Sequence, residues 1–250
     1  MKNRLSLNLR IWRQESSFSK GKFEYYCISD LSPDVSLLEA LDQLNETLII
    51  QGERPIYFEH DCREGICGSC GFLVNGQAHG PQDATTICQL YLRHFMDKTT
   101  LSLEPWRAKA FEVVQDLVVD RSSLDRLIIS GGFCSPDSVP PPDANSILVD
   151  HDDAFSAFQT ASCIGCGACI ASCRNASASL FVAAKLAHLA QLPQGHLDSK
   201  QRAESMQTQM IREGFGSCSN NLECEAVCPK EISADWISWM NNKAKIFNRN

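Results

Sequence analysis

Alternating apolar and polar residues open the chain and predict a β-hairpin. In residues 5–11 every second side chain is Leu or Ile, and the residues between them are Ser, Asn and Arg. A period of two is typical of a strand with one buried face. Residues 16–21 are turn-like, and the apolar run at 23–28 supplies a returning strand. Residues 36–46 then change to a helical period, with four leucines on one face.

Later patterns predict a division of the chain into two domains. Residues 72–76 predict a strand that ends in an Asn-Gly turn, residues 101–105 predict a further strand, and residues 108–129 have a helical period. The Pro-rich segment 131–143 is typical of an extended linker. Helical periods return after it, at 154–162, 175–192, 199–213 and 234–247. We therefore expect domains at 1–130 and 151–250, joined by a linker at 131–150.

Composition and charge narrow the chemistry. A formal net charge of −7 over 250 residues argues against nucleic acid as a partner, because phosphate binding requires a basic surface. The first ten residues alternate and do not resemble a secretory signal. No segment reaches the roughly 18 apolar residues that a membrane helix needs. The chain nevertheless has 13 cysteines, so metal binding by reduced thiols is favoured over disulfides.

Four cysteines in the first domain have the spacing of a plant-type [2Fe–2S] site. A gap of four residues is followed by a gap of two, and a fourth thiol lies downstream. The predicted ligands are Cys62, Cys67, Cys70 and Cys88. Gly65, Gly68 and Gly71 allow the backbone to turn its N–H groups toward the sulfurs. The polar insert at 77–84 is expected to bulge outward without moving Cys88.

Seven cysteines in the second domain have the spacing of a two-cluster ferredoxin, in which the fourth thiol of the first run, already entering a helix, ligates the other cluster. A [4Fe–4S] cluster is predicted on Cys163, Cys166, Cys169 and Cys228. The other cluster is predicted on Cys173, Cys218 and Cys224. Asn221 stands where a full repeat would have a Cys, so this second cluster is predicted to be [3Fe–4S]. The expected fold is α+β, a plant-type ferredoxin-like β-grasp domain followed by an all-α, bacterial-ferredoxin-like domain.

The remaining thiols and the histidines have simpler interpretations. Cys27 lies in an apolar strand and is predicted to be a core residue, whereas Cys134 lies in the linker and is predicted to be an unligated thiol. No two histidines have a paired ligand spacing, and only His60 lies near a cysteine motif. Met206 and Met210 are predicted to pack on a helix. Structural zinc is the alternative for each cysteine set.

The three cysteine motifs, their order and the chain length resemble the iron–sulfur subunit of succinate dehydrogenase and quinol:fumarate reductase. The motifs that carry the resemblance are residues 62–70, 163–173 and 223–230. The resemblance implies an electron-transfer subunit without catalytic residues of its own. Its three clusters would connect an FAD-containing flavoprotein, where succinate and fumarate are interconverted, to a quinone in a membrane cytochrome b anchor. It also implies a peripheral position on the cytoplasmic face of the bacterial inner membrane.

Two further details qualify the resemblance. The insert with His79, Gly80 and Pro81 resembles the bacterial branch whose anchor is a single dihaem cytochrome b chain. In contrast, Arg174 stands where the ubiquinone-linked members have Pro, and Ser219 stands where they have His. No Trp follows within 175–180, so the quinone contacts are not carried over. An iron–sulfur subunit of a soluble flavin oxidoreductase, without a quinone anchor, is the alternative function.

Overall fold

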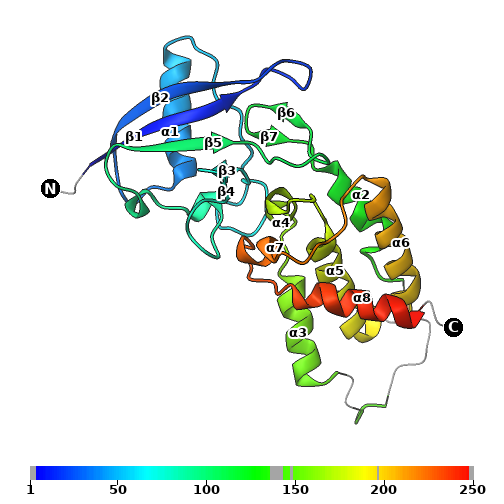
Figure 1. Ribbon diagram of the computed structural model, residues 1–250. Coiled ribbons are helices and arrows are strands. Elements are labelled where there is room, and N and C mark those ends of the chain that lie inside the picture. Colours follow the sequence, from blue (N-terminus) through cyan, green and yellow to red (C-terminus); the bar gives the residue numbers. More distant parts are fainter. Residues whose placement is uncertain (1–3, 136–142, 147–148, 196, 248–250) are drawn as a thin grey trace.

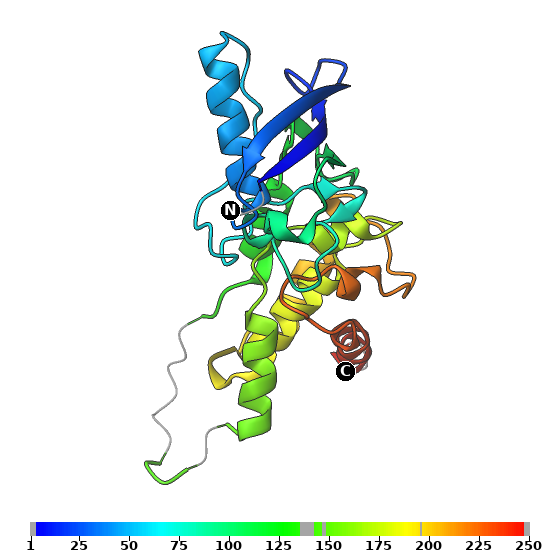
Figure 2. The same cartoon turned by 90° about the vertical axis from the view of Figure 1, so that its left-hand side faces the viewer.

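A five-stranded mixed sheet forms one end of the protein and a group of helices forms the other (Figure 1 and Figure 2). The computed structural model describes residues 4–135, 143–146, 149–195 and 197–247. The strands are β1 (Leu5–Arg13), β2 (Lys22–Leu31), β3 (Leu73–Val74), β4 (Gln77–Ala78) and β5 (Thr99–Glu104). Their order is β2-β1-β5-β3-β4, in which β1 and β5 are parallel and the other pairs are antiparallel.

The predicted hairpin and the helix after it are confirmed. Leu7, Leu9 and Ile11 of β1 are fully or almost fully buried, because every second side chain faces the core. Helix α1 (Leu37–Ile50) covers them with its leucine face. A capping box fixes its start, since the Ser36 hydroxyl accepts from the Glu39 N–H and the Glu39 carboxylate accepts from the Ser36 N–H.

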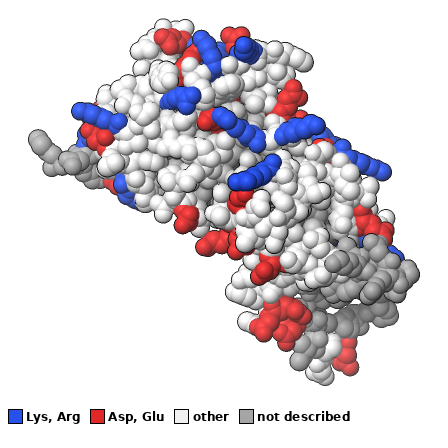
Figure 3. Space-filling model, viewed as in Figure 1, with Lys and Arg blue, Asp and Glu red and all other residues white. Residues whose placement is uncertain are grey.

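The helical end is built around α5 (Ser179–Gln191), which is buried on almost every side. It packs against α3 (His151–Ala161), α6 (Ser199–Arg212) and α8 (Asp235–Phe247). Two short helices, α4 (Ala168–Ser172) and α7 (Glu223–Ala226), contact each other near the sheet. Acidic side chains gather at the lower end of the face in Figure 3, where α3 begins. No helix in the described part of the chain is long and apolar enough to cross a membrane.

The segment 108–129 is only partly helical, so that prediction was wrong for its first half. After an isolated bridge between Ala108 and Phe111, β6 (Val113–Gln115) and β7 (Val118–Val119) form a two-stranded sheet. Helix α2 (Ser122–Gly131) starts only beyond them. The β-branched valines fit a pleated pair better than a helix. The turn between the strands carries Asp116, whose buried carboxylate accepts from two backbone N–H groups and from the Arg54 guanidinium.

Two further sequence interpretations are corrected. Cys27 is exposed on β2, because the register pairs it with Asn8 on the exposed face of the hairpin. The insert at 77–84 does not simply bulge outward. Its first residues form β4, paired with β3 through the predicted Asn-Gly turn, and Ala78 and His79 are buried. The predicted packing of Met206 is confirmed, since its side chain is fully buried.

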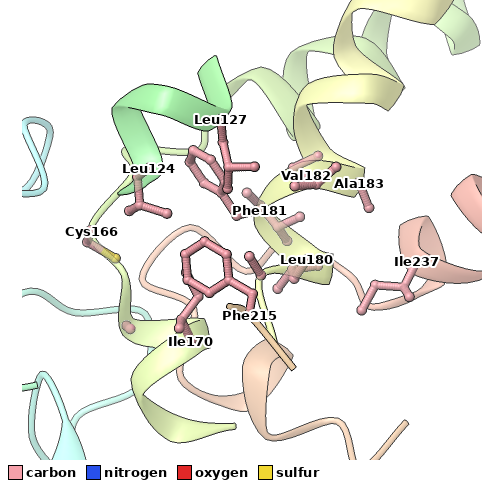
Figure 4. Close-up of a cluster of buried hydrophobic side chains, with 14 of the residues drawn as sticks. Leu124, Leu127, Cys166, Ile170, Leu180, Phe181, Val182, Ala183, Phe215 and Ile237 are labelled. Atoms are coloured by element: carbon pink, nitrogen blue, oxygen red, sulfur yellow. The ribbon is translucent and has the colours of Figure 1, made fainter. Parts of the chain in front are cut away.

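Helix α2 packs in the core of the helical end. Leu124 and Leu127 belong to one buried cluster with side chains of α5, including Phe181, and Cys166 lies at the edge of this cluster (Figure 4). The chain between α2 and α3 contains the predicted linker, of which residues 136–142 and 147–148 lie outside the described residues. The proposed division at residue 130 therefore stays a prediction.

Candidate metal centres

The first cysteine set lies in the loop before β3 and in the short 3₁₀ helix Ile87–Gln89. Two backbone N–H groups, those of Glu64 and Ile66, donate to Cys62 Sγ at 3.4 and 3.5 Å. Gly65 and Gly68 have φ values of 71° and 74°, a left-handed region in which other residues are strained. The predicted backbone freedom is thus used at both glycines, and the N–H groups on either side of Gly65 point at a sulfur. At position 71 glycine is required for a different reason, because a Cβ there would lie 2.4 Å from the Trp106 ring.

Hydrogen bonds favour the thiolate form of two members of this set. A hydrogen bond from the Cys70 thiol lowers the pKa of Cys88 to about 5, against the effect of burial, and the Thr86 hydroxyl at 3.2 Å assists. The same bond and burial raise the pKa of Cys70. Burial raises the pKa of Cys67, but hydrogen bonds from Ser69 and Cys62 outweigh it and lower the pKa to about 7. Thiolates are the form that binds iron.

The second set surrounds one cavity in the helical end. Cys163, Cys166, Cys169 and Cys228 line it together with apolar side chains of Leu180, Phe181 and Ile232. Gly165 and Gly167, with φ values of 64° and 86°, bend the chain between the thiols. The backbone N–H of Ile232 donates to Cys228 Sγ at 3.5 Å.

These four thiols fit a multinuclear cluster. Burial raises the pKa of Cys166 to about 12 and raises that of Cys169 well above its ordinary value. Four thiolates around an apolar cavity would therefore need compensating positive charge, which the irons of a cluster supply. Within the described residues, no three Cys, His, Asp or Glu side chains converge closely enough to bind a single metal ion.

The third set is held differently. Cys173 directly follows α4, whereas Cys169 lies inside that helix. These two thiols, four residues apart, are the ones predicted to bind different clusters. Cys173 therefore leaves a helix rather than entering one as predicted. Cys218 and Cys173 are the thiols that act electrostatically on Cys224, whose pKa burial raises to about 11. The backbone N–H of Asn220 donates to Cys218 Sγ at 3.4 Å.

The loop of the third set is polar and exposed. The side-chain amide of Asn175 donates to the Ser217 carbonyl at 2.8 Å and to the Ser219 hydroxyl at 2.9 Å. The same hydroxyl accepts from Asn221 at 3.3 Å. Residues 217–222 are all exposed, and Asn220 and Leu222 have positive φ values of 57° and 66°. Arg174, which replaces Pro, is 83% exposed and lies 3.8 Å from Glu223.

The loops of the first and second sets touch each other. A Cβ on Gly68 would lie 2.2 Å from the Ile164 carbonyl oxygen, so only glycine permits this approach. The buried Trp106 donates from Nε1 to the Cys166 carbonyl at 3.0 Å. Arg121 donates to the Gly68 carbonyl at 2.6 Å. The sequence interpretation missed Trp106 and Arg121, and no local spacing marks either residue.

Two family models match the chain. A 2Fe-2S iron-sulfur cluster binding domain matches residues 8–126, and a 4Fe-4S dicluster domain matches residues 159–232. These matches and the fold define an iron–sulfur protein in which a mixed-sheet domain precedes a helical region. A chain of the Mycobacterium smegmatis Sdh1 complex in the apo form shares this fold, with a TM-score of 0.76 at 20% identity over 99% of both chains.

Curated relatives narrow the family. The succinate dehydrogenase iron-sulfur subunit of Bacillus subtilis is 26% identical over 93% of this chain and 89% of its own length. The fumarate reductase iron-sulfur subunit of Wolinella succinogenes is 26% identical over 90% and 91%. This chain is thus similar, over most of its length, to iron–sulfur subunits of succinate dehydrogenase and fumarate reductase. An uncharacterized iron-sulfur protein of Methanococcus maripaludis is also similar, at 26%, but the chain covers only 37% of it.

Proposed function

We propose that this chain is the electron-transfer subunit of a succinate:quinone oxidoreductase. It would carry electrons between an FAD-containing flavoprotein, where succinate and fumarate are interconverted, and a quinone in a membrane cytochrome b subunit. The chain would have two domains joined by a linker, at 1–130 and 151–250. The first would have the plant-type β-grasp ferredoxin fold, and the second would have the fold of a bacterial two-cluster ferredoxin. The assembly would lie on the cytoplasmic face of the bacterial inner membrane.

The thiols would hold three clusters. The [2Fe–2S] cluster would bind to Cys62, Cys67, Cys70 and Cys88. The [4Fe–4S] cluster would bind to Cys163, Cys166, Cys169 and Cys228. The [3Fe–4S] cluster would bind to Cys173, Cys218 and Cys224. When bound, these groups supply reversible one-electron oxidation and reduction. The chain's own residues hold the groups in order, donate N–H groups to the sulfurs and exclude water from the middle site.

The proposal rests on the arrangement of the three cysteine loops, in which the first lies next to the second and the second next to the third. The first loop touches the second where Gly68 meets Ile164, and α4 joins the second set to the third over the four positions from Cys169 to Cys173. A path that enters at the exposed side of the first loop and leaves at the exposed third loop thus never leaves this chain. Such a path needs a redox partner at each end, which agrees with a flavoprotein and a quinone-binding subunit.

Electron paramagnetic resonance of the native complex tests the proposal. The oxidised complex should show a [3Fe–4S] signal, and mild reduction should produce a [2Fe–2S] signal. The complex should contain a cytochrome b and should oxidise succinate with a quinone as acceptor. A colourless protein that contains zinc and no acid-labile sulfide would refute the whole proposal.

A second function is favoured by the polar third loop. Arg174, Ser219 and Asn221 give this end amide, hydroxyl and charged groups, with Leu222 as its exposed apolar side chain. An iron–sulfur subunit of a soluble flavin oxidoreductase, without a quinone anchor, would need such a surface for a hydrophilic partner. A native complex that contains all three clusters, has no cytochrome b and stays in solution without detergent would support this function over the first.

A further inference from the structure

The depression between the first two cysteine sets is lined by cationic side chains. Cys67 and Cys163 open onto the same depression, of about 410 Å³, and Arg121 and Lys185 line it as well. Asp125 is the acidic residue of the lining. Both sets of thiols therefore share one local electrostatic environment, although they come from different ends of the chain.

Arg121 makes two short side-chain contacts in this region. Its Nη1 donates to the Gly68 carbonyl at 2.6 Å, and its Nη2 donates to Glu59 Oε2 at 2.7 Å. Its side chain is only 21% exposed. Gly68 is the residue whose backbone approaches Ile164, so the guanidinium fixes the first loop at the point where it meets the second.

The local position of Arg121 gives no other reason for its charge. It precedes the first residue of α2 and makes no side-chain cap of that helix. A cation at a helix N-terminus is unfavourable, because the backbone N–H groups there carry partial positive charge. The side chain instead extends away from α2 to the first loop, where it contacts Gly68 and Glu59. Its role therefore lies in the tertiary contact.

We infer that Arg121 is a positioning residue for electron transfer between the first two clusters, and that its charge raises the reduction potential of both. This inference rests on the proposed function. A reduced cluster carries one more negative charge than an oxidised one, so a fixed cation nearby stabilises the reduced form. The guanidinium at the same time bridges the Gly68 carbonyl and Glu59, which holds Gly68 in its close approach to Ile164 and so keeps the distance between the clusters short.

Three variants of the intact complex test this role. Arg121→Gln removes the charge and the fork, Arg121→Lys keeps the charge but loses the fork, and Arg126→Gln is the matched control. Arg126 lies on α2, which directly follows Arg121, is 51% exposed and pairs with Glu213. Midpoint potentials are measured by redox titration with electron paramagnetic resonance, and the spin–spin interaction between the two reduced clusters reports the distance between them.

Arg121→Gln should lower both midpoint potentials by an amount equal to roughly a threefold change in each reduction equilibrium, since part of the charge is already compensated by Glu59. Arg121→Lys should keep the potentials and weaken the spin–spin interaction, and Arg126→Gln should change neither. Potentials in Arg121→Gln that equal the wild-type values, or an equal shift in Arg126→Gln, would overturn the inference.

Failure of assembly is also informative. If Arg121→Gln lacks a cluster, the positioning role is tested with Arg121→Lys. A wild-type spin–spin interaction in Arg121→Lys would refute that role. Absence of both cluster signals from the wild-type complex would refute the proposed function instead. The two failures are therefore distinguishable.

Discussion

The middle and third cysteine sets share one short helix but lie in opposite environments. Cys166 is buried, and its set surrounds a cavity that α5 closes with Leu180 and Phe181. Cys218 is exposed, and its loop is held by amide and hydroxyl groups of Asn175 and Ser219. The helical core therefore determines the environment of the middle site. At the third site, the exposed loop contributes only part of the environment, and the molecule or solvent in contact with it contributes the rest.

This difference separates two kinds of residue. At the middle site a change of one side chain alters packing and metal binding together, because the thiols are part of the hydrophobic core. At the third site a change in the exposed residues 217–222 alters the chemistry of the loop and leaves the core intact. The following predictions test that separation.

Cys166→Ala should have the largest effect. Loss of a buried ligand should abolish the middle cluster and reduce the free energy of unfolding by about 3 kcal/mol or more, because cluster binding and folding are coupled. Iron and acid-labile sulfide per chain, together with chemical denaturation, measure the effect. Cys27→Ala on the exposed face of β2 is the control and should change stability by no more than about 0.5 kcal/mol. Full iron content in Cys166→Ala would refute the assignment of this ligand.

His79 should make the region between the first two sites sensitive to acid. Its ring is buried against Trp106, and neither ring nitrogen has a hydrogen-bond partner among the described residues. Burial, assisted by Arg121, lowers the pKa of His79 from 6.5 to about 4. Between pH 6.5 and about 4 the unfolded chain therefore binds a proton at His79 that the folded chain does not bind. The contribution of His79 to the free energy of unfolding is thus complete above pH 6.5 and is lost as the pH falls to about 4. The loss amounts to about 3 kcal/mol.

His79→Leu should therefore flatten the dependence of the denaturation midpoint on pH between 7 and 5. His151→Leu is the control, since that side chain is 89% exposed and should leave the dependence unchanged. An unchanged slope in His79→Leu would show that the acid sensitivity has another source.

Trp106→Phe should destabilise the contact between the first two loops. The variant keeps an aromatic ring but leaves the Cys166 carbonyl without its donor, which should cost about 1 to 2 kcal/mol. Chemical denaturation followed by the visible absorbance of the clusters measures this cost. Trp12→Phe removes a comparable N–H bond, to Gln14, in the partly exposed hairpin and should cost less. Equal costs at the two positions would argue against a special role for Trp106.

Asn221→Cys should have the smallest effect on stability and a clear effect on the cluster. The exposed side chain can be replaced within about 0.5 kcal/mol. A thiol at this position should complete a fourth corner, so the oxidised-state [3Fe–4S] signal should disappear and the potential of the third site should fall. Asn221→Ser offers no thiol and should retain the signal. Persistence of the signal in Asn221→Cys would show that residue 221 does not face the vacant corner.

Local patterns sufficed for the regular elements at the two ends. Period-two alternation predicted β1, the leucine face predicted α1, and apolar periods predicted α3, α5, α6 and α8 to within a few residues. The same reasoning failed for 108–121, because two short valine strands can be mistaken for a helical face when their partner is not known. It also placed Cys27 inside, since the face of a hairpin that packs on a helix is chosen by register rather than by composition.

The sequence by itself supplied the spacings from which the three groups of thiols are predicted, because ligand spacing is a property of the chain. Only the tertiary structure decided which groups meet and what surrounds them. Gly68 illustrates both parts. Its conformational freedom was predictable from its place between two cysteines, and its φ of 74° agrees. Its contact with Ile164, some hundred residues further along the chain, was not predictable, because that contact depends on how the sheet and the helices pack together. Arg121 and Trp106 act across the same contact and were missed for the same reason.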